Sequence, residues 1–209
     1  MIKVENIDVW GFEHAIRGMR NPKNSWDKSD SYFRGETSWG IGKNDLDLMK
    51  RLYKAGTEHR TYARMIQVSM DITAPLYWWK EMDRYTVGKS QVSCSTMHKI
   101  AAKEFELDDF SHEHLIETVS NTTNTVMALK NLIACLNYHR SQFIFTKDKQ
   151  YWWQLIQLLP SSYNQRRTVC MSYETVFKII RERTGHKLDE WNDFVKILEE
   201  LPYVQEIKE

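Results

Sequence analysis

The sequence predicts an α+β fold: a helix-rich single domain, spanning residues 1–209, around a small and mainly antiparallel sheet. Residues 66–73 alternate between apolar and polar side chains, which is typical of a strand with one buried face. Most other segments carry apolar residues at the spacing of amphipathic helices. The expected strands are not each followed by a crossover helix, so a doubly wound α/β fold fits less well.

The N-terminal quarter is expected to hold one strand, two helices and a long loop. In order, these elements are a strand over 2–10, a helix over 12–19, a loop over 23–42 and a helix over 44–55. Pro22 stops the first helix, because proline lacks the N–H that a helix needs. Asn44 is the expected N-cap of the second helix, and Gly56 follows its C-terminus.

The stretch from Met65 to Lys99 organises the rest of the chain. Its strand ends at Ala74-Pro75, and a short aromatic helix then leads into residues 84–86. Residues 87–96 are small and polar, which predicts a loop rich in hydrogen-bond donors. A polar loop held between a buried strand and an aromatic helix is a candidate ligand-binding element.

The C-terminal half is predicted to be mostly helical. The expected elements are helices over 126–138 and 147–159, an extended segment over 166–171, and helices over 172–184 and 188–198. Ser172 is a favourable N-cap residue. Glu174 falls in the first turn of the same helix, where the helix dipole favours a negative charge.

Composition excludes several classes of function. The net charge is +1 and the pI is about 7.7, which gives no electrostatic case for nucleic-acid or membrane binding. The three cysteines, Cys94, Cys135 and Cys170, are widely spaced, as in a reduced protein without structural zinc. The chain starts without an apolar signal segment and has no membrane-length run, so we expect a cytoplasmic protein.

Two small motifs offer chemistry but favour simpler interpretations. Cys94 and His98 would form a thiolate pair if that segment were helical, whereas an inert thiol in a polar loop is the favoured alternative. The His112-Glu113-His114 motif has no third ligand at a useful spacing, so we expect surface histidines and no metal site.

Basic residues gather beside predicted helix ends and loops. They are Arg84, Lys89, Arg166, Arg167, Arg181 and Arg183. Guanidinium groups match phosphate geometry, so these loops either converge on a nucleotide or carry six unrelated surface cations. The spacing of these residues alone does not distinguish between these two alternatives. Another three arginines, Arg17, Arg20 and Arg34, lie in or near the loop 23–42, and there solvated surface is favoured over an anion-binding rim.

The order of these motifs resembles the flavin-dependent thymidylate synthases. The resemblance rests on Leu-Met-Lys at 48–50, Gly-x-Glu at 56–58, the strand ending in Ala74-Pro75, the aromatic helix with Arg84, the Ser-rich loop, Leu159-Pro160, Arg166 and Arg183. It implies a homotetramer that binds FAD and dUMP at subunit interfaces. It also implies methylation of dUMP with methylenetetrahydrofolate and a reduced nicotinamide cofactor.

The family signature, roughly R-H-R-x-x-S-x-N-E-x-S-x-R, begins at Arg84. The resemblance implies FAD contacts from Arg84, Tyr85, Thr86, Gln91 and Arg183, and substrate contacts from Lys89, Ser90, Cys94 and Arg166. Much of the signature is replaced: Tyr85 stands for its histidine, Thr86 for its second arginine and Thr96 for its last. In the later block, Glu174 stands where the family has a substrate-binding arginine.

These replacements bear on dUMP, whose phosphate is anionic. Each lost charge-assisted hydrogen bond costs about 1.5–3 kcal/mol, so the loss of several weakens binding by powers of ten. Two hypotheses follow. The chain is a divergent FAD-dependent enzyme, in which water or Tyr85 takes the proton, or a non-catalytic nucleotide- or partner-binding oligomeric module on the same fold.

Overall fold

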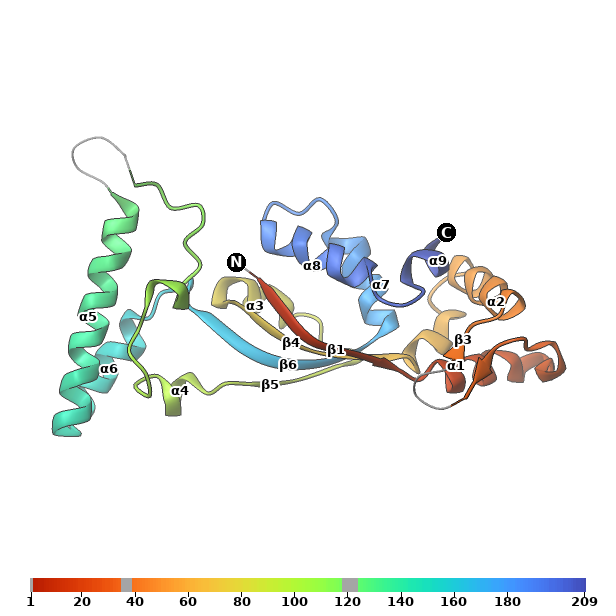
Figure 1. Ribbon diagram of the computed structural model, residues 1–209, viewed down its shortest axis with the longest axis horizontal. Helices are drawn as coiled ribbons and strands as arrows, with labels where there is room; N and C mark the ends of the chain where they lie inside the picture. Colours follow the sequence, from red (N-terminus) through yellow and green to blue (C-terminus); the bar gives the residue numbers. More distant parts are fainter. Residues whose placement is uncertain (1, 35–38, 118–123) are drawn as a thin grey trace. The chain divides into compact units, whose positions relative to one another are not determined.

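The computed structural model describes residues 2–34, 39–117 and 124–209. The chain forms two compact units (Figure 1). Unit 1 comprises residues 1–3, 72–84 and 92–167, and unit 2 comprises residues 4–71, 85–91 and 168–209. The single domain expected from the sequence stays a prediction.

The described residues form helices and strands in a mixed order along the chain. The strands are β1 (Lys3–Trp10), β2 (Tyr32–Phe33), β3 (Trp39–Gly40), β4 (Gln67–Pro75), β5 (Lys89–Ser93) and β6 (Asn164–Ser172). The α-helices are α1 (Phe12–Arg20), α2 (Lys43–Lys54), α3 (Leu76–Met82), α4 (Thr96–Lys99), α5 (Thr125–Thr146), α6 (Lys149–Leu158), α7 (Tyr173–Arg183), α8 (Asp189–Glu199) and α9 (Val204–Lys208). Short 3₁₀ turns lie at Asn21–Lys23, Trp26–Lys28, Arg60–Arg64 and Leu107–Asp109.

The main sheet has four strands in the order β1-β4-β6-β5, and β2 and β3 form a separate antiparallel pair. This small antiparallel sheet among many helices confirms the predicted α+β class. The predicted alternation is also confirmed, because Val68, Met70 and Ile72 of β4 are buried and their neighbours are only half-buried.

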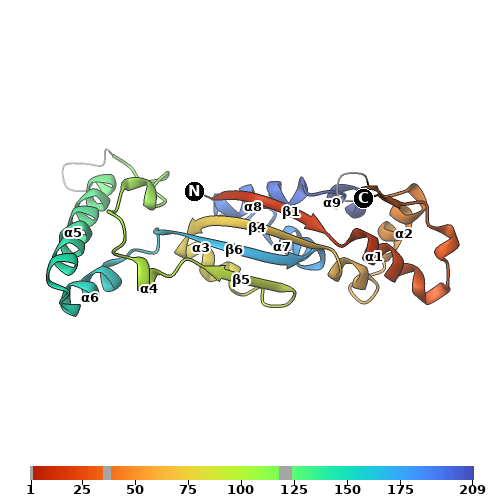
Figure 2. The same cartoon turned by 60° about the horizontal axis from the view of Figure 1, so that its bottom comes forward.

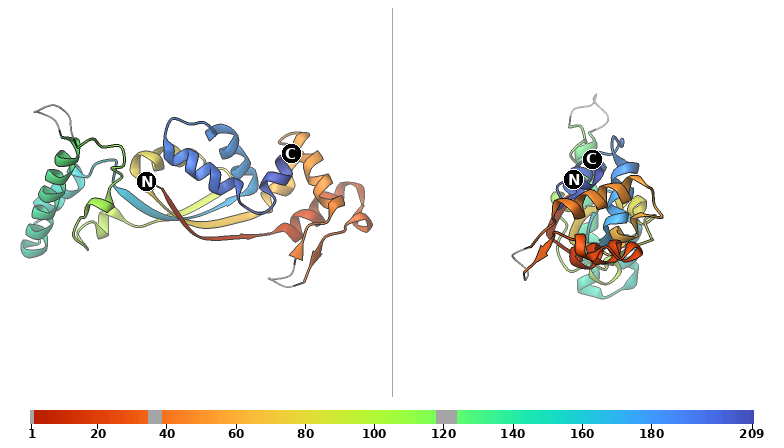
Figure 3. Two further views of the ribbon diagram at one scale, coloured as in Figure 1. Left: turned by 45° about the horizontal axis from the view of Figure 1, so that its top comes forward. Right: turned by 90° about the vertical axis from the view of Figure 1, so that its right-hand side faces the viewer.

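In unit 2, α7 and α8 cover one face of that unit's part of the sheet (Figures 1 and 2). Their inward side chains include Phe177, Trp191 and Phe194, which are buried together with Met171 of β6. Helix α2 packs against α9, as Figure 3 shows. Burial of large apolar side chains is the main stabilising contribution to such a layer.

In unit 1, α5 and α6 lie side by side as a helical hairpin (Figure 1). Their inner faces share one apolar cluster with the segment that precedes α5. Its buried members are Ile100, Phe105, Phe110, Leu129, Ile133, Leu136 and Leu155. The helix predicted over 126–138 is therefore confirmed, but α5 extends beyond residue 138 and ends only where Lys147 adopts a left-handed conformation.

The prediction of a polar loop over residues 87–96 is wrong for most of that segment. Residues 89–93 form β5, and α4 begins at Thr96. Backbone pairing overrides the polar composition, because the Ser172 N–H donates to the Gly88 carbonyl at 2.8 Å in unit 2. In unit 1 the Cys94 N–H donates to the Arg166 carbonyl at 3.0 Å.

The predicted N-cap of α2 is also wrong. Gly42 occupies the cap position, and the side chain of Asp30 accepts hydrogen bonds from the Asn44 and Asp45 N–H groups at 2.9 and 3.2 Å. A carboxylate from the preceding loop therefore satisfies the free N–H groups of the helix start. Ser172 does cap α7 as predicted, since its Oγ accepts from the Thr175 N–H.

Within the described ranges, the structure has no helix that is both long and apolar enough to cross a membrane.

Candidate functional site

The turn before β5 is fixed by the start of α7 in unit 2. Gly88 has φ +68°, and a Cβ atom there would lie 2.7 Å from Ser172 Oγ. Thr175 Oγ1 donates to the Val87 carbonyl at 2.9 Å. Only glycine combines this left-handed conformation with so close an approach. The N-terminal turn of α7 therefore determines where β5, with its candidate residues, begins.

Tyr85 and Arg183 meet inside unit 2. Arg183 Nε donates to the Tyr85 hydroxyl at 2.9 Å, and its guanidinium lies 4.3 Å from the ring centroid of Trp191. Tyr85 is only 5% exposed. Burial raises the Tyr85 pKa, although the hydrogen bond from Arg183 partly offsets that shift. The structure thus brings two predicted FAD contacts together, and the two side chains are hydrogen-bonded to each other.

The other candidates of unit 2 lie on or beside β5. Thr86, Ser90 and Gln91 are exposed, and Lys89 is half-buried. Lys89 Nζ donates to Gln91 Oε1 at 3.1 Å. This segment presents hydroxyl, amide and ammonium groups, which are suitable hydrogen-bonding partners for a polar ligand.

In unit 1, Cys94 and Arg166 are neighbours across the β5 and β6 pairing. Besides the Arg166 contact, the Cys94 carbonyl accepts from Gln165 Nε2 at 2.8 Å. The side chains of Cys94 and Arg166 are both exposed. Arg84 is exposed as well; it lies two residues after the end of α3, and its N–H donates to the Glu81 carbonyl at 3.2 Å.

The hypothetical thiolate pair of Cys94 and His98 is not supported by the geometry. Cys94 lies before α4 and outside the helix, so the two residues do not share a helical face. The His98 ring instead places Nδ1 2.8 Å from Ser95 Oγ. Among the residues described, no group of three or more His, Cys, Asp or Glu side chains is arranged to hold a metal ion.

The predicted basic group separates into internal and surface residues. Arg167 donates to Asp83 at 2.8 Å and lies 4.2 Å from the Trp79 ring centroid, so it supports the packing of unit 1. Arg183 has the same kind of role in unit 2. Arg181 is exposed and lies 3.8 Å from Glu182. The six residues therefore do not act as one set of equivalent cations.

Arg20 was expected to be solvated surface or part of an anion-binding rim, and neither prediction is correct. Its side chain is buried, and Nε donates to Asp45 Oδ1 at 2.6 Å. Asp45 Oδ2 accepts from Ser29 Oγ, Ser31 Oγ and the N–H groups of residues 30 and 31. Arg20 is therefore a structural anchor for the loop before α2.

Glu174 also has a partner that is distant in the sequence. Arg60 Nη2 lies 3.1 Å from Glu174 Oε1 and also donates to Thr57 Oγ1 at 2.9 Å. Both charged side chains are largely buried, and Arg60 Nε and Glu174 Oε2 have no hydrogen-bond partner among the described residues. The pair joins positions 114 residues apart, which no local pattern could predict.

Comparison with known proteins finds similarity in three-dimensional structure only. No protein-family model matches the chain, and no curated protein sequence matches it. Among solved structures, it is similar to thymidylate synthase X (ThyX) from Helicobacter pylori with FAD and dUMP. That match has a TM-score of 0.68 and 17% identity, and it covers 100% of this chain and 96% of the other.

A second structure of H. pylori ThyX, described as a flavin-dependent thymidylate synthase complexed with FAD and dUMP, gives a TM-score of 0.68 at 16% identity. It covers 99% of this chain and 96% of the other. The UMP/dUMP methylase PolB from Streptomyces cacaoi, bound with 5-Br UMP, gives 0.63 at 12% identity, with 95% and 87% covered. Since these identities are low, the likeness concerns architecture, and this chain has the fold of the flavin-dependent thymidylate synthase ThyX.

Proposed function

We propose that this chain is a divergent relative of the FAD-dependent thymidylate synthases that keeps nucleotide binding and has lost dUMP methylation. The fold match supports descent from a protein that binds such ligands. The exposed Arg84 and Arg166 and the half-buried Lys89 support retained affinity for an anion.

The observation that carries the proposed loss is Glu174 with its partner Arg60. The resemblance implies an arginine at position 174, where this chain has a carboxylate that cannot donate to a phosphate. Arg60 compensates the charge, but its Nη2 is used by Glu174 and Thr57. The position therefore serves internal stability in place of substrate binding.

FAD fits the candidate residues only in part. When bound, it would supply the redox chemistry of the family. Tyr85 and Arg183 hold each other, so the FAD contacts proposed in unit 2 fall to Thr86 and Gln91. Of the proposed contacts in unit 2, Thr86 and Gln91 are neutral, so we expect the diphosphate to be held weakly. For the substrate, Lys89, Ser90, Cys94 and Arg166 remain the proposed contacts.

The test is a paired binding measurement with H. pylori ThyX as the positive control. Absorbance spectra with and without added FAD report flavin binding, and isothermal titration reports dUMP binding. We expect weak binding of either ligand, at least tenfold weaker than in the control, and no formation of methylated product. Product formation at a rate comparable to the control would contradict the proposal.

A partner-binding oligomeric module is the second candidate. β5 is an edge strand of the main sheet, and Val87 before it and Val92 within it are 83% and 76% exposed. Exposed edge strands with apolar side chains are typical places for pairing with another chain. If neither FAD nor dUMP binds at millimolar concentration, this candidate replaces the first.

We also propose a homotetramer, as the family resemblance implies, and a cytoplasmic location, as the sequence predicts. Light scattering after size-exclusion chromatography measures the mass directly. A monomeric mass at micromolar concentration would contradict the tetramer, whatever the outcome of the ligand titrations.

A further inference from the structure

Unit 2 contains a cleft whose lining includes none of the residues proposed to bind FAD or dUMP. Its volume is about 580 Å³, within the usual range for small-molecule sites. The lining residues are Asp8, Val9, Trp10, Gly11, Phe12, Glu13, His14, Phe33 and Trp39. They come from the end of β1, the start of α1, and the β2 and β3 pair.

Aromatic rings form much of this cleft. Trp39 stacks with two phenylalanines, with ring centroids 5.0 Å from Phe12 and 6.3 Å from Phe33. Trp10 adds an indole that is 45% exposed. Gly11 makes the corner between β1 and α1 possible, because a Cβ atom there would overlap the Met65 carbonyl oxygen. The corner at Gly11 therefore brings the end of β1 and the start of α1 together at this cleft.

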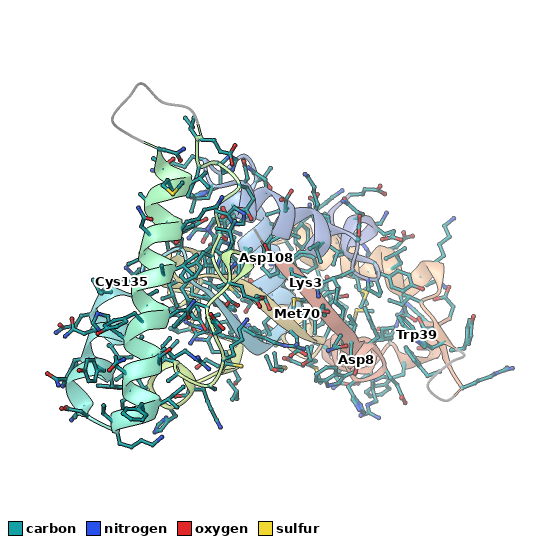
Figure 4. The ribbon with its side chains drawn as sticks, turned by 60° about the vertical axis from the view of Figure 1, so that its left-hand side comes forward. Lys3, Asp8, Trp39, Met70, Asp108 and Cys135 are labelled. Carbon is teal, nitrogen blue, oxygen red and sulfur yellow. The ribbon has the colours of Figure 1, made fainter. Side chains whose placement is uncertain are left out.

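The charged groups of the cleft are negative. Asp8 and Trp10 lie two positions apart on β1 and so share one face of the strand, and Glu13 lies in the first turn of α1. Figure 4 labels Asp8 beside Trp39. In the part of the chain that the structure describes, neither Asp8 nor Glu13 forms an ion pair.

The remaining polar side chain of the cleft, His14, does not reverse this balance. Arg17 Nη2 lies 3.1 Å from His14 Nδ1, and because an arginine can only donate, Nδ1 is the acceptor in this contact. Arg17 itself lines a smaller neighbouring cavity of about 170 Å³. Among the described residues, the lining of the larger cleft therefore combines aromatic rings with two carboxylates and contains no lysine or arginine.

We propose that this cleft binds a small organic cation of the alkylammonium class. A cation gains from the ring quadrupoles and from the two carboxylates together, whereas an anion is repelled by both. The proposal is independent of nucleotide binding, because none of its residues belongs to the FAD or dUMP set.

The test uses choline and its neutral isostere 3,3-dimethylbutan-1-ol, which has a carbon in place of the ammonium nitrogen. Binding is followed by tryptophan fluorescence and by isothermal titration on the full chain. We expect choline to bind at least about fivefold more tightly than the alcohol. We also expect Trp10→Leu and the double variant Asp8→Asn/Glu13→Gln each to reduce choline affinity by about three- to tenfold.

Matched controls are Trp153→Leu on α6, an indole of similar exposure, and Asp27→Asn, neither of which lines the cleft. They should leave choline binding unchanged. Trp10 and both carboxylates are exposed, so their variants are expected to fold, and circular dichroism checks this. The proposal would be overturned if choline and the alcohol bound with equal affinity, or if neither bound. It would also be overturned if the control variants lost as much choline affinity as the cleft variants.

Discussion

Arg60 and Glu174 form an ion pair at 3.1 Å inside unit 2, and both side chains are at least four-fifths buried. Desolvation of two charges is costly, and here one nitrogen and one oxygen of the pair remain without a hydrogen bond among the described residues. Removal of either partner would therefore leave the other charge buried and unpaired, which destabilises the fold.

We accordingly expect Arg60→Met to lower the free energy of unfolding by about 3–5 kcal/mol, because it leaves the Glu174 carboxylate buried and unpaired. The double variant Arg60→Met/Glu174→Leu should recover most of that loss. Urea unfolding of both variants measures the difference. Lys196→Met, which breaks an exposed pair with Asp193, is the control and should cost less than about 1 kcal/mol.

If the double variant were as unstable as the single one, the loss would come from packing around Arg60, which also lies over the Tyr53 ring, and not from the unpaired charge.

Asp45 provides a pH-dependent contribution to stability. Burial alone would raise its pKa, but hydrogen bonds from Ser31, Ser29 and Arg20 outweigh that effect and hold the Asp45 pKa below its usual value. A lowered folded-state pKa means that the stabilisation is complete above the unfolded pKa of about 3.9. It is then lost as the pH falls through the folded-state pKa.

We expect Asp45→Asn to lower the unfolding free energy at pH 7 by about 2–4 kcal/mol, because Arg20 loses its charged partner. The difference from the unmodified protein should shrink below pH 4. Urea midpoints between pH 2.5 and 7 test this, with the exposed Asp47→Asn on the same helix as control. A difference that does not change with pH would argue against the role of this carboxylate.

The glycine at position 88 should tolerate no side chain. Gly88→Ala adds the strain of φ +68° and a contact of 2.7 Å with Ser172 Oγ. Gly185→Ala adds comparable strain at φ +72° but meets no atom within 4 Å. We expect about 1 kcal/mol of destabilisation at position 185 and about 2–3 kcal/mol at position 88. Thermal unfolding of the two variants compares them, and equal losses would show that the Ser172 contact is easily relieved.

Tyr85 gives a test that separates packing from cofactor binding. Tyr85→Phe removes the acceptor of Arg183 Nε and should lower the unfolding free energy by about 1 kcal/mol. Because the hydroxyl is used internally, FAD affinity should change less than twofold. A Thr86→Val variant, at an exposed neighbouring position, is expected to weaken FAD instead. The reverse ranking in a flavin absorbance titration would assign Tyr85 to the cofactor.

The sequence predicted well those elements whose packing follows from local pattern. β4 alternates apolar and polar residues, and the α7 cap depends on Ser172 alone, so both were found. β5 was missed because its residues are polar, and its conformation is set by pairing with β6, which is about 75 residues away along the chain. Long-range partners also explain the wrong N-cap of α2, where Asp30 reaches in from the preceding loop.

The candidate site followed the same division. The family motif located Tyr85 and Arg183, and the structure brings them together. Their mutual hydrogen bond and the Arg60 partner of Glu174 depend on three-dimensional packing, which spacing in the sequence does not encode. The aromatic cleft was not predicted either, because Trp10, Phe33 and Trp39 lie on separate elements without a shared period.

The Asp45 carboxylate has a consequence for the order in which the chain folds. It accepts hydrogen bonds from Asp30 and Ser31, while the Asp30 carboxylate caps the helix that bears Asp45. The loop and the helix start therefore satisfy each other's hydrogen-bonding groups, and we expect the two to form together. The closures involved span only 14 to 25 residues, so their entropic cost is small. In hydrogen exchange, the amides of residues 30, 31 and 45 should thus lose protection together, as one cooperative opening unit.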